Sequence, residues 1–332
     1  MTLKKFLYLI TTIIMSASLL IGCSSNTADK QDDKVKITMI TNVGGVNDES
    51  FNQSAWEGLQ KAKKDLGVEV GYIESKQEAD YATNIETAIE GNNDLIIGTG
   101  YQLQDAILEA AKNYPEQKFA IVDADYGDKT PENVTCITFN EEQSAYVVGL
   151  VAGKMTKTNK VGFIGGLNNV VIKKFEAGFE AGAKDANPNV EVLTQYANTF
   201  VDAAKGKTIA TQMYKNNVDV IFAAAGDTGL GVIECAKESG KFAIGVDRDQ
   251  YSLAPDNILT SAMKKVNEGV YQVVTDLNEG NFSGGKVLSL GLKDDAIGLA
   301  PTTDKNVPQD VIDFVNEQSE KIINGEIVVP TK

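Results

Sequence analysis

The chain has 332 residues, 42% of them hydrophobic, and carries 46 acidic against 31 basic side chains, for a net charge of −15. This length is sufficient for two domains with separate cores, and the acidic balance argues against a partner whose phosphate backbone must be neutralised, so no nucleic-acid partner is expected. Histidine is absent, which excludes Ser-His-Asp and Cys-His catalysis and removes the commonest metal ligand. We expect no metal site and no cofactor.

The first 22 residues predict a signal peptide. Two lysines precede an apolar run over residues 6–20, which is too short for a comfortable membrane span. The run ends in Leu-Ile-Gly-Cys, which resembles a bacterial lipobox, in which Cys23 is lipidated and becomes the new N-terminus. The alternative is an ordinary signal whose small residue happens to precede a cysteine. We therefore expect a protein anchored by lipid to the cell membrane and facing outside the cytoplasm.

Residues 23–35 are small, polar and charged and predict a flexible tether. After them, short apolar runs alternate with longer amphipathic ones, a pattern typical of βαβ units with parallel sheets and therefore of an α/β fold. The expected strands are residues 36–41, 68–73, 95–98, 119–123, 134–139, 161–164, 190–193, 218–224 and 242–246. The expected helices are residues 50–66, 78–89, 103–113, 141–156, 171–186, 202–215, 228–239, 264–279 and 308–323.

The alternation restarts after residue 140, which predicts two similar lobes rather than one large sheet. The segment 257–263 follows a turn and is expected to return the chain to the first lobe. The expected N-terminal lobe is residues 36–139 plus about 258–282, and the expected C-terminal lobe is residues 140–257 plus about 283–332. Two lobes joined by several crossings suit hinge closure around a ligand.

The loop after the first strand is the first candidate binding wall, because ligands of open α/β sheets bind outside the carboxyl ends of strands. Asn42 stands at that strand end, and Ser50 with Gln53 three residues later forms a capping-box pattern that predicts a helix start near Phe51. Phe51 begins an apolar stripe at helical spacing, which favours core packing over ligand stacking. Asp48 is expected to be an ordinary loop or first-turn acid favoured by the helix dipole.

Two carboxylates occupy equivalent strand ends in the two halves of the chain. Asp123 ends a strand of the first half and Asp247 ends a strand of the second. Either could accept hydrogen bonds from a sugar diol. A pair of carboxylates also suits a glycosidase, which needs an acid and a base at a defined separation, and the sequence leaves that alternative open.

Three further residues are candidates for contact with a ligand. Gly226 lies in a Gly-Asp-Thr-Gly turn that permits close approach of the backbone to a ligand, although a tight strand-to-helix turn needs no ligand. Phe200 lies between a strand and a helix and is less easily assigned to a core stripe than Phe51. Lys264 could place its ammonium group beside a ribose hydroxyl, and a solvated lysine is the alternative.

In order and spacing, these stretches resemble the basic membrane protein family of substrate-binding lipoproteins, specifically the purine nucleoside receptor branch that serves ABC transporters. The resemblance implies a type I periplasmic-binding-protein fold, with two Rossmann-like lobes of parallel sheet joined by three hinge crossovers. It also implies a non-enzymatic, monomeric receptor that captures nucleosides, purine nucleosides in particular, and delivers them to an ABC transporter permease. The segments that carry the resemblance are residues 44–53, 119–123, 175–179, 200–206, 225–232, 244–250 and 259–261.

The same resemblance implies a base held between Phe51 and Phe200, and a ribose held by strand-end groups of both lobes. Where family members often carry aspartate at the end of the first strand, this sequence has Asn42, whose amide both donates and accepts hydrogen bonds. Broader purine tolerance, or pyrimidine binding, is compatible with that change. The expected ligand-binding residues are Asn42, Phe51, Asn52, Tyr101, Asp123, Phe200, Gly226, Asp247 and Lys264.

Two alternatives to a nucleoside receptor remain open from the sequence. One is a sugar-binding or signalling receptor of the same fold. The other is a nucleoside hydrolase that uses Asp123 and Asp247.

Overall fold

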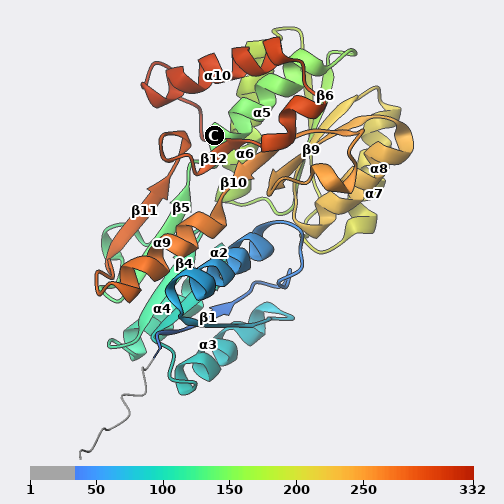
Figure 1. The fold of residues 1–332 in the computed structure, drawn as a ribbon. Coiled ribbons are helices and arrows are strands. Elements are labelled where there is room, and N and C mark those ends of the chain that lie inside the picture. The colour runs from blue at the N-terminus through green and yellow to red at the C-terminus, as the bar shows by residue number, and fades with distance from the viewer. Residues whose placement is uncertain (1–33) are drawn as a thin grey trace, which may run out of the picture. The chain divides into compact units, whose positions relative to one another are not determined.

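The structure is a computed structural model that describes residues 34–332, of which Val35–Lys332 form one compact unit. The predicted signal peptide, the lipidation of Cys23 and nearly all of the predicted tether concern residues outside this described part. Within residues 34–332, no helix is long and apolar enough to cross a bilayer. The chain builds two six-stranded sheets with interleaved helices (Figure 1), which confirms the predicted α/β class.

The first sheet belongs to the N-terminal lobe, and its strands are all parallel, in the order β11-β5-β4-β3-β1-β2. Helices α2 and α9 share a core with one face of the sheet, and α3 and α4 share a core with the other. Because both faces are covered, a central strand such as β3 is buried at every residue. The strands are β1 Lys36–Ile40, β2 Glu69–Ile73, β3 Leu95–Thr99, β4 Lys118–Val122, β5 Val134–Phe139 and β11 Lys286–Leu290. The helices are α2 Phe51–Leu66, α3 Tyr81–Glu90, α4 Gln104–Asn113 and α9 Val266–Asn278.

The second sheet belongs to the C-terminal lobe, in the order β12-β10-β9-β8-β6-β7, and only the β10–β12 pair in it is antiparallel. Helices α5, α6 and α10 share a core with one face, and α7 and α8 share a core with the other. The strands are β6 Lys160–Gly165, β7 Glu191–Tyr196, β8 Val220–Ala224, β9 Phe242–Asp247, β10 Ile258–Lys264 and β12 Ile297–Leu299. The helices are α5 Glu141–Met155, α6 Val170–Ala186, α7 Ala203–Lys215, α8 Asp227–Ser239 and α10 Gln309–Ile323. Short 3₁₀ helices lie at Glu78–Asp80, Tyr101–Leu103, Gly127–Lys129, Tyr251–Leu253, Leu292–Asp294 and Pro301–Lys305.

Every strand and helix expected from the alternation is present within a few residues of its predicted bounds, but the predicted lobe boundaries late in the chain are wrong. Residues 258–264 form β10, which pairs with β9 in the C-terminal lobe, whereas β11 pairs with β5 in the N-terminal lobe. The chain therefore crosses between lobes after β5, after β10 and after β11. Strand pairing determines the lobe to which each strand belongs. The sequence of an apolar run does not show which sheet the run joins.

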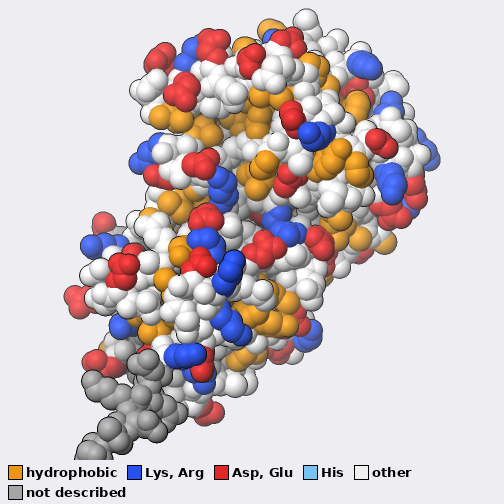
Figure 2. Space-filling model, viewed as in Figure 1, with side chains coloured by type: hydrophobic (Ala, Val, Ile, Leu, Met, Phe, Trp, Pro, Cys, Tyr) orange, Lys and Arg blue, Asp and Glu red, His pale blue; other side chains and the backbone are white. Residues whose placement is uncertain are grey.

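Acidic and basic side chains are interspersed over the face of the molecule drawn in Figure 2, which shows no continuous basic surface there.

Helices α5 and α6 pack with their backbones in direct contact. A Cβ atom added to Gly182 in α6 would lie 2.1 Å from the carbonyl oxygen of Tyr146 in α5, and one added to Gly149 would lie 2.4 Å from the carbonyl oxygen of Phe179. The contact places Glu141, at the start of α5, beside the first turns of α6 that border the cleft described below.

We expect Gly182→Ala to lower the free energy of unfolding by about 1–3 kcal/mol, because the added methyl group overpacks the contact between the two helices. Urea unfolding followed by circular dichroism measures this change. Gly229→Ala in α8 is the matched control: its added methyl group would be 3.6 Å from the nearest atom, and alanine favours a helix by up to about 1 kcal/mol. Equal stability of the two variants would contradict the backbone contact.

Candidate functional site

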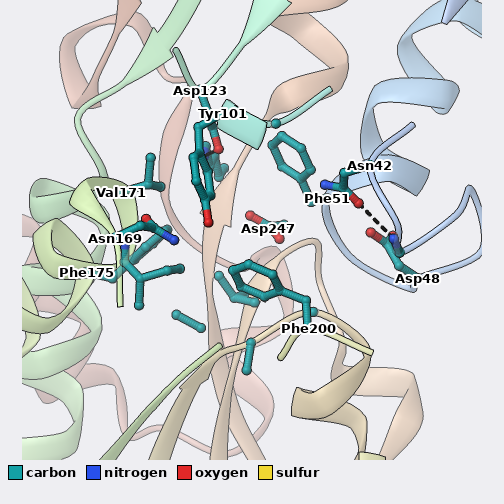
Figure 3. Close-up of a pocket in the computed structure, with 18 of the residues that line it drawn as sticks. Asn42, Asp48, Phe51, Tyr101, Asp123, Asn169, Val171, Phe175, Phe200 and Asp247 are labelled. Carbon is teal, nitrogen blue, oxygen red and sulfur yellow. Dashed lines mark hydrogen bonds and ion pairs between the residues drawn. The ribbon is translucent and has the colours of Figure 1, made fainter. Parts of the chain in front are cut away.

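A cleft lies where the carboxyl ends of strands from both lobes meet (Figure 3). Eight of the nine predicted ligand-binding residues line it: Asn42, Phe51, Tyr101, Asp123, Phe200, Gly226, Asp247 and Lys264. Asn52 is buried behind Asn42 instead.

Two aromatic rings enter the cleft from opposite lobes (Figure 3). Phe51 is the first residue of α2, and it lines the cleft while also packing against the core of its own lobe. Phe200 comes from the loop between β7 and α7, and its ring lies against the backbone of Gly166, where a Cβ atom would be 2.1 Å from the ring. The two uses proposed for Phe51, core packing and a place in the cleft, are therefore both realised.

Asp48 caps helix α2, and the predicted Ser50–Gln53 capping box is wrong. Its carboxylate accepts hydrogen bonds from the backbone N–H groups of Ser50, Asn52 and Gln53, at 3.0, 2.8 and 3.0 Å. The hydroxyl of Ser50 donates instead to Asp247 in the other lobe. Burial raises the pKa of Asp48 against these hydrogen bonds, which lower it. Asp48 also borders the cleft, with its acceptor capacity already used by its own loop.

Asn52 positions Asn42. The amide of Asn52 donates to the side-chain oxygen of Asn42 at 2.9 Å, and the N–H of Gly44 donates to the same oxygen at 2.9 Å. Thr99 in turn donates to the side-chain oxygen of Asn52 at 2.7 Å. Because its oxygen is used twice within the loop, Asn42 turns its NH₂ group, a hydrogen-bond donor, toward the cleft.

Asp123 and Asp247 occupy the same place in the two lobes. Each lies at the end of a strand with left-handed backbone, φ +65° and +63°, a conformation that aspartate tolerates better than most residues. Burial raises the pKa of Asp123 to about 6, and Lys264 beside it limits the rise. Burial likewise raises the pKa of Asp247 to about 7.

Lys264, at the end of β10, joins these carboxylates and is only 1% exposed. Its Nζ lies 2.5 Å from Asp123 Oδ2 and 3.1 Å from Glu141 Oε1. Burial alone would lower the pKa of Lys264, but Asp123, Glu141 and Asp247 outweigh burial and raise it. The second oxygen of Asp123 is buried without a hydrogen-bond partner among the described residues. An oxygen so placed can accept a hydrogen bond from a ligand hydroxyl.

Arg248, the chain's single arginine, bridges the lobes at the edge of the cleft. Its guanidinium contacts Glu49 at 2.8 Å and Glu57 at 2.7 Å, both from the N-terminal lobe. Gln250 adds a third contact by donating to the backbone oxygen of Glu49 at 2.9 Å. The sequence analysis did not assign this role, although a lone arginine beside a strand-end aspartate was a visible signal.

The sequence analysis also missed the contribution of α6. Asn169, which caps α6, and Val171, Ile172 and Phe175 within it line the cleft. Phe175 is hard to recognise because its spacing to Phe179 fits an ordinary core stripe. Among residues 34–332, no group of three His, Cys, Asp or Glu side chains is placed to hold a metal ion.

Comparison with known proteins agrees with this geometry. Residues 34–332 match the family model described as ABC transporter substrate-binding protein PnrA-like. The chain is 45% identical to the CD4+ T-cell-stimulating antigen of Listeria innocua, with 99% of each chain covered. It is 39% identical to the ABC transporter nucleoside-binding protein BmpA of Lactococcus lactis, with 99% of this chain and 100% of that one covered. A solved solute-binding protein of an ABC transporter from Aeropyrum pernix superposes with a TM-score of 0.83 at 29% identity, covering 90% of this chain and 94% of that one. This likeness confirms the expected type I fold.

Asp247 should make the stability of the ligand-free protein depend on pH. Its pKa rises from 3.8 to about 7 on folding, so between these values the folded state holds a proton that the unfolded state has released, and stability falls as pH rises. We expect Asp247→Asn to flatten the decline in unfolding free energy between pH 5 and 7 by up to about 1.4 kcal/mol per pH unit. Urea titrations at pH 5, 6 and 7 measure the slope.

Asp256→Asn is the control for that experiment, because it removes an exposed carboxylate from the same lobe. It should leave the slope unchanged. A slope for Asp247→Asn equal to that of the wild type would contradict a raised pKa.

We expect Arg248→Gln to open the lobes of the ligand-free protein. Partly exposed ion pairs contribute up to about 1 kcal/mol each, so loss of both shifts the closed population by roughly tenfold. Small-angle X-ray scattering should report a larger radius of gyration. Lys207→Gln is the matched control, since Lys207 also contacts two glutamates, Glu234 and Glu238, but within one lobe. An unchanged radius for Arg248→Gln would exclude a role in closure.

Proposed function

This chain belongs to the PnrA-like family of ABC transporter substrate-binding proteins, and from that premise we propose that it captures nucleosides between its lobes and delivers them to a membrane permease. The observation that carries the proposal is the pair Phe51 and Phe200, which face one cleft from opposite lobes with strand-end carboxylates beside them. A flat heterocycle joined to a sugar diol has the complementary shape and chemistry.

The family consists of substrate-binding proteins, not enzymes, so the hydrolase alternative is wrong. The surroundings of its proposed acid and base support this conclusion. Asp123 is held by Lys264, and Asp247 accepts a hydrogen bond from Ser50. Both carboxylates therefore take part in contacts between the lobes.

The energetics of such a site are favourable. Stacking of a base on an aromatic ring contributes on the order of 1–3 kcal/mol, and each hydrogen bond to a charged group contributes about 1.5–3 kcal/mol. Together with bonds from the ribose to Asp123, Asp247 and Lys264, and less the cost of closing the lobes, these terms suffice for micromolar or tighter affinity. A ligand without the diol would leave buried carboxylates unpaired, so free bases should bind much more weakly.

The relative BmpA of Lactococcus lactis, named a nucleoside-binding protein, supports the same ligand class. Purine nucleosides fit two facing rings best, since their bicyclic bases offer the larger stacking surface. The proposal includes a monomer anchored through lipid on Cys23, outside the cytoplasm, where a permease can receive the ligand. Mass spectrometry of small molecules released from the purified, denatured protein identifies the ligand directly. Displacement of a bound nucleoside by ribose alone would favour the sugar-binding alternative.

We expect Phe200→Ala to weaken nucleoside binding by roughly tenfold, the scale of one lost stack, while the thermal midpoint changes little, because Phe200 is only half-buried in a loop. Isothermal titration calorimetry with adenosine and guanosine measures the affinity. Val201→Ala is the matched control, since Val201 is the exposed neighbour and does not line the cleft. Equal affinity of Phe200→Ala and the wild type would remove Phe200 from the stack.

A further inference from the structure

Asp227 is a residue of the cleft that has no role in the function proposed above. It is the first residue of α8, it lines the cleft, and its Oδ1 is buried with no hydrogen-bond partner among the described residues. A carboxylate at a helix start often satisfies free N–H groups there. Here the N–H of Thr228 donates to the carbonyl of Phe200 at 3.2 Å, and that of Gly229 donates to the carbonyl of Gly226 at 2.8 Å. Main-chain carbonyls thus take up donors that the carboxylate of Asp227 could have bound.

Asp227 lies beside Phe200, one of the two rings proposed to hold the base. Gly226, directly before it, packs against Phe200, since a Cβ atom at Gly226 would lie 3.2 Å from the carbonyl oxygen and 3.5 Å from the Cβ of Phe200. Burial, and after it the charges of Asp48 and Glu49 on the loop that carries Asn42, raise the pKa of Asp227 to about 6. These contacts place Asp227 at the base end of the cleft, on the side of Phe200.

The other polar groups at the base end are not free acceptors. The carboxylate of Asp48 is used by the N–H groups of its own loop, and the oxygen of Asn42 already accepts two hydrogen bonds. Asn42 offers a donor there and Asp227 offers acceptors. The buried Oδ1 of Asp227 has no donor among the described residues, and a charged oxygen buried without a donor is costly, so a ligand that brings N–H groups to it gains affinity that a ligand without them cannot.

We propose, on the basis of the nucleoside-binding function above, that Asp227 determines base specificity by accepting hydrogen bonds from the N–H edge of the base, and that this edge is of the guanine type. Guanine presents two adjacent donors, the ring N1–H and the 2-amino group, which match the two oxygens of a carboxylate. Its neighbouring O6 is an acceptor and complements the NH₂ group of Asn42. Inosine has the same edge without the 2-amino group and provides the matched ligand.

The test compares the binding of two ligands to four proteins, the wild type and three variants, by isothermal titration calorimetry. The wild type should bind guanosine on the order of tenfold or more tightly than inosine, the scale of one hydrogen bond to a charged group. In Asp227→Ala the ratio should fall toward one, mainly through loss of guanosine affinity. Asp227→Asn should reduce the ratio as well, because its NH₂ group opposes the donors of the base. Asp256→Asn, which removes an exposed carboxylate of the same lobe, should leave the ratio unchanged.

The outcomes separate the two proposals. A guanosine-to-inosine ratio that is the same in the wild type and in Asp227→Ala would overturn the role of Asp227 while leaving the nucleoside site intact. A wild type that binds neither nucleoside would overturn the proposed function and this inference together. Equal thermal midpoints of the wild type and variants confirm that a lost ratio reflects recognition of the base and not unfolding.

Discussion

The buried ammonium group of Lys264 is the interaction on which the rest of the site depends. It stands at the end of β10, where the chain leaves the C-terminal lobe, and contacts Asp123 at the end of β4 in the N-terminal lobe. Its other partner, Glu141, begins α5 directly after the first crossing between lobes. One cation thus links two of the three crossings to the cleft. Because a buried charge is costly without partners, this arrangement constrains how the lobes can sit when the site is formed.

Some polar groups in the walls of the cleft are hydrogen-bonded within the protein, and others have no hydrogen-bond partner there. Asp48 is a strongly acidic residue at the edge of the cleft, yet its oxygens are used to start α2. Asn52 likewise serves Asn42 and does not face the cleft. By contrast, Asp123 and Asp227 each keep a buried oxygen without a partner among the described residues. Because buried polar groups normally have a hydrogen-bond partner, an unpartnered oxygen that also lines the cleft is a candidate contact for a ligand.

Closure of the lobes is stabilised from outside the cleft as well as inside it. Arg248 bridges Glu49 and Glu57 at the rim, and the Ser50 hydroxyl reaches Asp247 within the cleft. The loop that follows β1 therefore supplies one wall of the site and also the contact surface for the opposite lobe. A ligand held between Phe51 and Phe200 would add to contacts that already favour the closed arrangement. Such a ligand would shift the population of the protein toward closed lobes.

The sequence by itself determined most of the local elements and eight of the twenty residues that line the cleft. The alternation of apolar and amphipathic runs depends on neighbouring residues, so the helices and strands β1 to β9 were predicted nearly to their ends, whereas β10, β11 and β12 were not predicted as strands. Strand-end residues such as Asp123 and Asp247 were recognised by position. Only the tertiary structure decided which sheet β10 and β11 join, that Asp48 and not Ser50 caps α2, and that Asn42 turns its NH₂ group to the cleft. It also decided that Lys264 binds Asp123, 141 positions away in the chain. These features depend on hydrogen bonds and burial between distant segments, and no local pattern records which distant partner a side chain meets.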